Sequence, residues 1–152
     1  MIRIREATGF DVPWLLEQLR EFADFYGTKR SLFPSDDAVA HALITHLITQ
    51  GKFFLAVDHA SDKCVGFIAG LLGPSAYNPE ITQLTELFWW VAPSRRGSSA
   101  GARLLNRFEE YGREVGADWL VMTLEAKSPV DPASLERRGF RLHERSYLME
   151  VA

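Results

Sequence analysis

The sequence predicts one α/β domain built on a mixed sheet, with the element order β-α-α-β-β-β-α-β-α-β-β. Segments with the two-residue alternation of strands and segments with the three- and four-residue spacing of helices follow one another along the chain. The length of 152 residues suits one domain, and apolar residues make up 47%, enough for a sizeable core. No repeat, linker or low-complexity stretch divides the chain, so we expect a single domain over residues 1–152.

The first third of the chain predicts a strand followed by two helices. Residues 2–5 alternate in polarity, which is typical of a half-buried strand. A helix that ends at Gly27 is indicated by one apolar stripe, formed by Val12, Leu15, Leu16, Leu19, Phe22, Ala23 and Tyr26. A second helix begins within residues 34–37, where Ser35 is the expected cap. Its expected buried face is Val39, Ala42, Leu43, Leu47 and Ile48.

Three β-prone runs follow, at residues 53–57, 64–72 and 81–92. A polar turn joins the first two runs, which predicts a hairpin. The third run ends in aromatic residues that should alternate between the two faces of the sheet: Phe88, Trp89 and Trp90.

The last third predicts a helix, a strand, a short helix and a final pair of strands. The first of these helices starts within residues 93–101, and its core stripe is Leu104, Leu105, Phe108, Tyr111, Gly112 and Val115. Residues 119–124 are the expected strand and residues 129–138 the short helix. Residues 140–151 can supply the final pair of strands.

Charge and composition exclude several classes of function. The formal net charge is −3, and the basic cluster Arg95-Arg96 is too short for a nucleic-acid surface. No run approaches the roughly 18 apolar residues of a membrane span, and the N-terminus has no secretory signal, so we expect no membrane contact and a cytoplasmic location. His41 and His46 are five residues apart and do not share a helix face, so no metal site is expected.

A loop rich in small residues joins the third β run to the following helix. It spans residues 91–101, and its small side chains would let the backbone approach a ligand closely. The first helical turn adds unpaired N–H groups and the positive end of the helix dipole, which together suit a pyrophosphate. Arg95 or Arg96 can add a charge-assisted contact. No lysine is present in the loop, so it does not match a nucleoside-triphosphate loop.

This loop resembles the cofactor loop of GNAT N-acetyltransferases. That family carries an apolar residue, a proline, then Arg/Gln-x-x-Gly-x-Gly/Ala and a leucine-rich helix. The corresponding residues here are Val91, Pro93, Arg96, Ser99, Gly101, Leu104 and Leu105. Ser99 departs from the pattern, since glycine is usual there. The opening segment 4–8, Gly66-Phe67-Ile68 and the segment 136–140 extend the resemblance over nearly the whole chain.

The resemblance implies how acetyl-CoA would be held. Trp90, Val91 and Pro93 map to the strand that binds the pantetheine, and a backbone N–H of Trp90 or Val91 would polarise the acyl oxygen. Ser128 takes the place of an asparagine that often contacts the cofactor. The amides expected to hold the pyrophosphate belong to Arg96, Gly97, Ser98, Ser99, Ala100 and Gly101.

The resemblance also implies catalytic residues. Glu86 lies near the place of a catalytic glutamate, and burial in its apolar stretch would raise its pKa and suit it to act as a base. Glu125 is a weaker candidate. Leu135 stands where relatives often carry the tyrosine that protonates the thiolate. Ser134 and Tyr147 are the substitutes that we consider.

The expected function is therefore transfer of an acetyl group from acetyl-CoA to a primary amine. The acceptor can be a small molecule or a protein amine, and a homodimer is left open. The alternative is a GNAT-fold domain with little or no activity that binds acyl-CoA as a sensor or serves as an interaction module.

Overall fold

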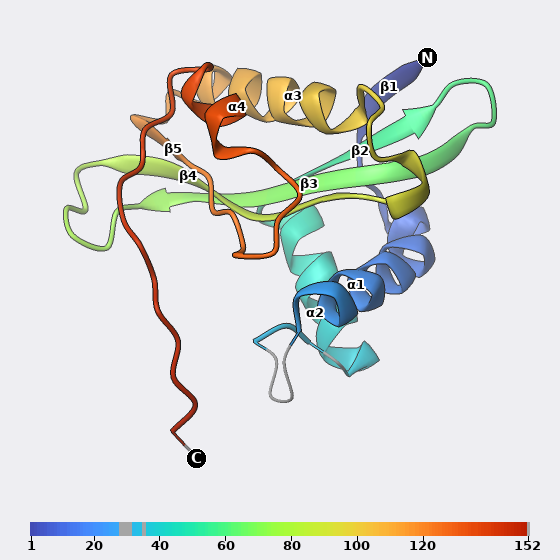
Figure 1. The fold of residues 1–152 in the computed structure, drawn as a ribbon, viewed down its shortest axis with the longest axis horizontal. Helices are drawn as coiled ribbons and strands as arrows, with labels where there is room; N and C mark the ends of the chain where they lie inside the picture. Colours follow the sequence, from blue (N-terminus) through green and yellow to red (C-terminus); the bar gives the residue numbers. More distant parts are fainter. Residues whose placement is uncertain (28–31, 35, 152) are drawn as a thin grey trace.

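The computed structural model describes residues 1–27, 32–34 and 36–151 and shows a five-stranded mixed sheet between two layers of helices (Figure 1). The strands follow one another in the sheet in sequence order, and each pair is antiparallel except the last, which is parallel. This confirms the predicted mixed α/β fold. The strands are β1 (Ile2–Glu6), β2 (Lys52–Asp58), β3 (Lys63–Pro74), β4 (Thr82–Val91) and β5 (Trp119–Val121).

Two helices cover each face of the sheet. Helices α1 (Val12–Tyr26) and α2 (Asp37–Thr49) lie on one face, and α3 (Ala100–Glu114) and α4 (Pro132–Glu136) lie on the other (Figure 1). None of these helices, nor any other helical stretch of the described residues, is long and apolar enough to cross a membrane.

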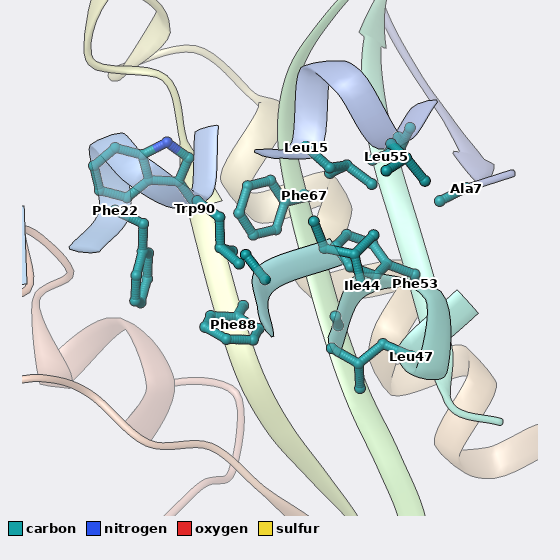
Figure 2. Close-up of a cluster of buried hydrophobic side chains, with 14 of the residues drawn as sticks. Ala7, Leu15, Phe22, Ile44, Leu47, Phe53, Leu55, Phe67, Phe88 and Trp90 are labelled. Carbon is teal, nitrogen blue, oxygen red and sulfur yellow. The ribbon is translucent and has the colours of Figure 1, made fainter. Parts of the chain in front are cut away.

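The larger core cluster lies between the sheet and the helices α1 and α2 (Figure 2). The predicted stripe of α1 is confirmed, because its members are buried or partly buried against the sheet. Phe22 and Trp90 meet edge to face, with ring centroids 5.6 Å apart. The buried Gln18 accepts a hydrogen bond from the indole N–H of Trp90, at 3.2 Å, so that polar group is satisfied inside the core. Each fully buried leucine, isoleucine, valine or phenylalanine side chain of this cluster contributes about 1.5–3 kcal/mol.

The predicted buried face of α2 is partly wrong. Val39 is 58% exposed and Ala42 is also exposed. Asp36 caps the helix, since its carboxylate accepts hydrogen bonds from the backbone amides of Ala38 and Val39. Ser35, the expected cap, lies outside the described residues. The helix carries apolar residues on more than one side, so packing rather than periodicity selects the buried stripe, which is Ala40, Ile44 and Leu47.

A β-bulge in β4 changes which side chains face the two helical layers. The register between β3 and β4 shifts after the Ala69–Phe88 pair, which leaves Leu87 as an extra residue on β4. As a result, Leu84 packs on the α3 face and Phe88 on the α1–α2 face, although regular alternation would place both on one face. Gly70 lies opposite the bulge, and a Cβ there would come 2.4 Å from the carbonyl oxygen of Thr85, so the close approach requires glycine.

The predicted final pair of strands is not found. Residues 140–151, here called the C-terminal arm, form no strand and run away from α4 as an extended segment (Figure 1). A pair of strands within twelve residues needs a tight turn, and the arm contains no glycine, proline, asparagine or aspartate to make one. Strand β5 and helix α4 are also shorter than predicted, which leaves residues 122–131 as an irregular connection between them.

Candidate active site

The site lies where β4 and β5 separate. These parallel strands pair only from Gln83–Trp119 to Thr85–Val121, after which β4 continues to Val91 and the chain after β5 leaves the sheet. The opened wedge holds two open hollows of about 380 and 610 Å³, volumes that include space open to solvent. Both are lined by Tyr26, Trp89 and Ser128, so they adjoin each other, and we call them together the cleft, with an inner part near the fork and an outer part near the start of α3.

The inner part of the cleft contains the buried Glu86. Its other walls are aromatic and apolar side chains from α1 and β4, and both polar and apolar residues from the irregular segment after β5. The full lining is Phe22, Tyr26, Glu86, Leu87, Trp89, Thr123, Leu124, Glu125 and Ser128. The lining combines aromatic side chains with several polar groups, among them the carboxyls of Glu86 and Glu125.

The Glu86 carboxyl has the properties of a proton acceptor near neutral pH. Its side chain is only 5% exposed, and its Oε2 accepts a hydrogen bond of 3.2 Å from the Thr123 amide. Burial raises the pKa of Glu86 to about 8, the nearby charge of Glu125 adds to this rise, and the Thr123 hydrogen bond opposes it. The predicted effect of burial on this pKa is therefore found in the structure.

The outer part of the cleft is lined by the predicted anion loop. Its lining residues come from α1, β4, the loop and the segment before α4. They are Tyr26, Trp89, Trp90, Val91, Arg96, Gly97, Ser98, Gly101, Ser128, Pro129 and Val130. Gly97 has a φ of 84°, a left-handed conformation that glycine adopts without strain, and this turn brings the loop backbone round to the cleft.

Four amides at this loop have no acceptor within the described part of the chain. The amides of Ser98 and Arg103 are used, since they donate to carbonyl oxygens of Arg95 and Ser99, and the amide of Ala100 donates to the Ser98 hydroxyl. The amides that remain are those of Gly97, Ser99, Gly101 and Ala102. They stand at the positive end of the 15-residue helix α3, whose first turn contains no acidic residue. This arrangement suits a phosphate or pyrophosphate group.

Gly101 forms part of the cleft floor. A Cβ added there would lie 3.6 Å from Cγ2 of Val91 and 3.8 Å from Cζ2 of Trp89, both ordinary contact distances. A larger side chain would therefore be accepted by the fold but would occupy the outer cleft. The residue fits a position at which a ligand approaches the backbone closely.

The two loop arginines take different positions. Arg95 forms an ion pair of 3.2 Å with Asp58, so its guanidinium lies against the end of β2. The guanidinium of Arg96 stacks 4.6 Å from the Trp90 ring centroid, and its Nε donates to the Val91 carbonyl at 3.2 Å. Its Nη2 is buried without a hydrogen-bond partner among the described residues. Of the two candidates, Arg96 is thus the one that lines the cleft.

The strand geometry also distinguishes the two candidate amides of β4, those of Trp90 and Val91. On the β3 side, the Ala92 amide donates to the Val65 carbonyl at 2.9 Å. Successive amides of a strand point to opposite edges, so the Val91 amide faces the open edge of β4 and the Trp90 amide faces β3. The Val91 amide is therefore the one available to the cleft.

Most of the predicted cofactor residues meet at this cleft. Those that line it are Trp90, Val91, Arg96, Gly97, Ser98, Gly101 and Ser128. Pro93, Ser99 and Ala100 do not line it. Ala100 is fully buried and packs in the α3 core cluster, Pro93 opens a short 3-10 turn, and Ser99 is the N-cap residue of α3.

The predicted substitutes for the missing tyrosine do not reach the cleft within one chain. Tyr147 lies on the C-terminal arm and is 87% exposed. Ser134 donates its hydroxyl to the Asp131 carbonyl at the start of α4, at 2.6 Å. Leu135 is buried and contributes no polar group. Among the described residues no cluster of histidine, cysteine and acidic side chains gathers that could hold a metal ion.

Sequence reasoning missed Tyr26 as a cleft residue. Tyr26 is the last residue of α1, and its ring packs against Phe22 with centroids 4.7 Å apart. Burial raises the pKa of Tyr26, and a side-chain hydrogen bond with Ser128 opposes this rise. Nothing in the sequence links α1 to a loop that lies about 100 residues later, so only the folded chain reveals this contact.

Comparison with known proteins identifies relatives of this architecture. The family model of the acetyltransferase (GNAT) family matches residues 14–140. No curated protein sequence matches the chain. Among solved structures, an acetyltransferase of Trypanosoma brucei is 20% identical with a TM-score of 0.73, covering 99% of this chain and 100% of its own.

Two further solved structures are similar over almost the full length. A predicted acetyltransferase of Clostridium acetobutylicum, described with acetyl-CoA, is 12% identical with a TM-score of 0.76, covering 99% of this chain and 96% of its own. A ribosomal-protein-alanine N-acetyltransferase of Brucella melitensis is 17% identical with a TM-score of 0.73, covering 99% of both chains. At these identities the structural likeness establishes the fold.

Proposed function

The chain belongs to the acetyltransferase (GNAT) family, and from this premise we propose that it transfers an acetyl group from acetyl-CoA to a primary amine. The observation that carries this proposal is the pair of adjoining hollows, one beside the unpaired amides of the anion loop and the other lined by the buried carboxyl of Glu86. One end suits a diphosphate and the other suits a base, so the two substrates of an acyl transfer would meet between them.

The residues of the outer cleft fit coenzyme A. The unpaired amides between Gly97 and Ala102 would hold its pyrophosphate, and the absence of a side chain at Gly101 leaves room for it. The Val91 amide, which faces the open edge of β4, would donate to the acyl oxygen. Acetyl-CoA supplies an acetyl thioester, whose sulfur leaves as a thiolate that needs a proton.

The inner cleft fits the amine. An alkylamine is mostly protonated at neutral pH and attacks only as the free base. Glu86 with a pKa of about 8 is well matched to accept that proton. The faces of Phe22 and Trp89 and the charge of Glu125 would favour a cation in the inner cleft before it loses the proton.

Tyr26 is the proton donor that we propose in place of the tyrosine missing at Leu135. It lines both parts of the cleft, and its raised pKa keeps the hydroxyl protonated over the working pH range. Tyr26→Phe removes only this hydroxyl and should lower kcat about tenfold, since water entering the open cleft can supply part of the proton transfer.

The matched control for Tyr26 is Tyr111→Phe. Tyr111 is also partly buried, but it packs against Phe54 on the α3 face and is not part of the cleft lining. Steady-state kinetics should show an unchanged kcat for this control and unchanged binding of coenzyme A for both variants. Equal kcat values for Tyr26→Phe and the native protein would remove Tyr26 from the mechanism.

The proposed function is tested by thiol release from acetyl-CoA in the presence of a panel of primary amines. The panel should include polyamines, amino acids, aminoglycosides and a peptide N-terminus, and calorimetry should measure coenzyme A binding in parallel. Turnover that depends on the amine supports the transferase. Binding of coenzyme A without turnover on any amine would favour the alternative, an acyl-CoA sensor, and absence of binding would defeat both.

A further inference from the structure

The guanidinium of Arg96 is the one charged group of the cleft lining that the proposed acetyl transfer does not use. The other two charged groups of that lining are the carboxyls of Glu86 and Glu125. Of the three guanidinium nitrogens of Arg96, only Nε has a hydrogen-bond partner among the described residues. No described acidic side chain forms an ion pair with it. A partly enclosed cation that lacks acceptors in its own chain indicates an anion that comes from outside.

Packing fixes the Arg96 guanidinium on the α1 side of β4. Its central carbon lies 4.6 Å from the centroid of the Trp90 ring and 4.9 Å from that of Phe25 in α1. Trp90 belongs to the core cluster of the α1–α2 face, where it lies beside Phe22 (Figure 2). The two rings and the hydrogen bond from Nε to the Val91 carbonyl hold the planar group in one orientation. The cation is therefore preorganised before any ligand binds.

The unpaired amides of the anion loop belong to the other side of β4. A Cβ at Gly101 would contact the side chains of Val91 and Trp89, which pack against the core cluster of the α3 face. The Arg96 guanidinium and the start of α3 are thus two separate anion-binding features on opposite sides of one strand. A pyrophosphate held by the amides leaves the guanidinium available for a second anion.

The charged groups of the cleft are separated by sign. The two carboxyls line the inner part, and the guanidinium of Arg96 lines the outer part. Tyr26 lines both parts and is affected by all three charges. Burial is the main cause that raises the pKa of Tyr26, the charge of Arg96 lowers this pKa, and the charges of Glu125 and Glu86 raise it. A ligand with a cation at one end and an anion at the other complements this arrangement better than a polyamine, which is cationic at both ends.

The position of Arg96 limits the length of such a ligand. The amide and the carbonyl of Val91 face the same open edge, because both groups of one strand residue point to one side. The amide is the proposed donor to the acyl oxygen, and the carbonyl accepts the Nε hydrogen bond of Arg96 at 3.2 Å. One residue of a strand spans about 3.3 Å, so an acyl group at this amide lies close to the guanidinium. The nitrogen that attacks the acyl carbon is equally close, and only a short spacer separates it from an anion bound to Arg96.

We propose that the acceptor is a short amino acid whose amine is acetylated and whose carboxylate binds the guanidinium of Arg96. This inference rests on the proposed transferase function and names its substrate class. The free amine forms the new carbon–nitrogen bond, the carbon–sulfur bond breaks, and the proton released by nitrogen balances the proton taken up by the thiolate. The carboxylate stays ionised throughout, and its charge-assisted hydrogen bonds to Arg96 orient the nitrogen toward the acyl carbon.

The first test compares amino acids with their amides. Glycine and alanine are assayed for thiol release against glycinamide and alaninamide, which have the same carbon skeleton without the negative charge. We expect kcat/KM to be at least about tenfold higher for the acids. The amine of the amides is the less basic one, so a preference for the acids cannot arise from a larger share of free amine. Equal or higher kcat/KM for the amides would overturn the inference and leave the transferase intact.

Variants of the two loop arginines assign the preference to one side chain. Arg96→Met keeps an apolar stem between the aromatic rings but removes the charge, and it should bring the ratio of acid to amide kcat/KM to about one. Arg96→Lys keeps the charge without the planar fork and should recover part of the ratio. Arg95→Met is the matched control, since Arg95 pairs with Asp58, and it should retain the native ratio. A structural defect would lower both rates alike, so a native ratio in Arg96→Met would refute the contact.

A truncated donor separates this role from a contact between Arg96 and the cofactor. Acetyl-pantetheine lacks the diphosphate and the nucleotide of acetyl-CoA. With this donor the native protein should still prefer the acids, and Arg96→Met should still lose that preference. If Arg96→Met instead weakens coenzyme A binding in calorimetry and keeps the preference for acids, the guanidinium serves the cofactor and the inference is wrong.

The length of the spacer gives the last test. In the series glycine, β-alanine, 4-aminobutyrate and 6-aminohexanoate, kcat/KM should be highest for the first two and should fall at least about tenfold by the last, because the charge-assisted contact is then lost. A maximum at the longest spacer would place the carboxylate away from Arg96 and contradict the inference. Absence of turnover on every amine would defeat the transferase itself and this inference with it, whereas turnover of amides or polyamines in preference to amino acids would defeat this inference alone.

Discussion

Gly101→Glu is expected to weaken coenzyme A binding at least about 100-fold, a loss of about 2.7 kcal/mol. The Cβ of the new side chain would meet Val91 and Trp89 at ordinary contact distances, so the protein should fold. The remaining atoms would fill the outer cleft and place a carboxylate against the amides proposed for the pyrophosphate. That carboxylate would both repel a diphosphate and accept hydrogen bonds from the same amides. Isothermal titration with coenzyme A measures the effect.

Two further variants of Gly101 distinguish the effect of the charge on coenzyme A affinity from the effect of side-chain size. Gly101→Ala adds only the methyl group and should stabilise the first turn of α3 by about 0.5–1 kcal/mol relative to glycine. Gly101→Gln has nearly the size of glutamate without its charge. The loss of affinity should increase from alanine to glutamine to glutamate. Native affinity in Gly101→Glu would mean that the loop does not bind the cofactor, whatever its resemblance to other loops.

The loop could be predicted because its chemistry is local. Small residues between a strand and a helix, with a glycine that takes a left-handed conformation at Gly97, form an anion site from a few consecutive residues. The same holds for α1, where spacing alone selects the buried stripe. In both cases the property follows from neighbours in the sequence, which is what periodicity and turn chemistry report.

Features set by tertiary contacts could not be predicted in this way. In α2 two apolar stripes compete, and packing selects the one that contains Ile44 rather than Val39. The bulge at Leu87 depends on pairing with β3, and it reverses the faces of Leu84 and Phe88. Tyr26 reaches the cleft only because α1 packs under the end of β4, a contact that no local pattern encodes.

The C-terminal arm shows a third reason why part of the fold could not be predicted from the sequence. The sequence predicts a final pair of strands within residues 140–151, and this prediction is wrong, because the structure has no strand there. Strand propensity describes a surface that packs and pairs, and it does not supply the partner strand. The arm contains no glycine, proline, asparagine or aspartate, and this absence argues against a tight hairpin turn and can be seen in the sequence.

Glu86→Gln is expected to lower kcat about 100-fold while coenzyme A affinity is retained. The amide can still accept the hydrogen bond from Thr123, so the local fold should persist. The native enzyme needs the ionised carboxylate, whose pKa is about 8, and kcat should therefore rise with pH until it levels off above that value. The variant should show no such rise. Parallel pH profiles in the two proteins would mean that another group accepts the proton.

Glu125→Gln is the matched control for this prediction. Glu125 lines the same inner cleft but is exposed, and its charge is one of the causes that raise the pKa of Glu86. Removing that charge should move the midpoint of the native pH profile to a lower value and leave the plateau near the native rate. A loss of the plateau would instead assign the base to Glu125.

The same carboxyl makes a prediction about stability that does not depend on catalysis. Its pKa in the folded chain is raised from 4.5 to about 8, so the folded state holds the proton more tightly than the unfolded state. The stabilisation that follows is complete below about pH 4.5 and is lost as the pH rises through about 8. Glu86→Gln cannot ionise, so its melting temperature relative to the native protein should increase from pH 5 to pH 9. A difference that stays constant over this range would show that Glu86 is ionised in the folded protein, and it could then not be a base poised to accept a proton at neutral pH.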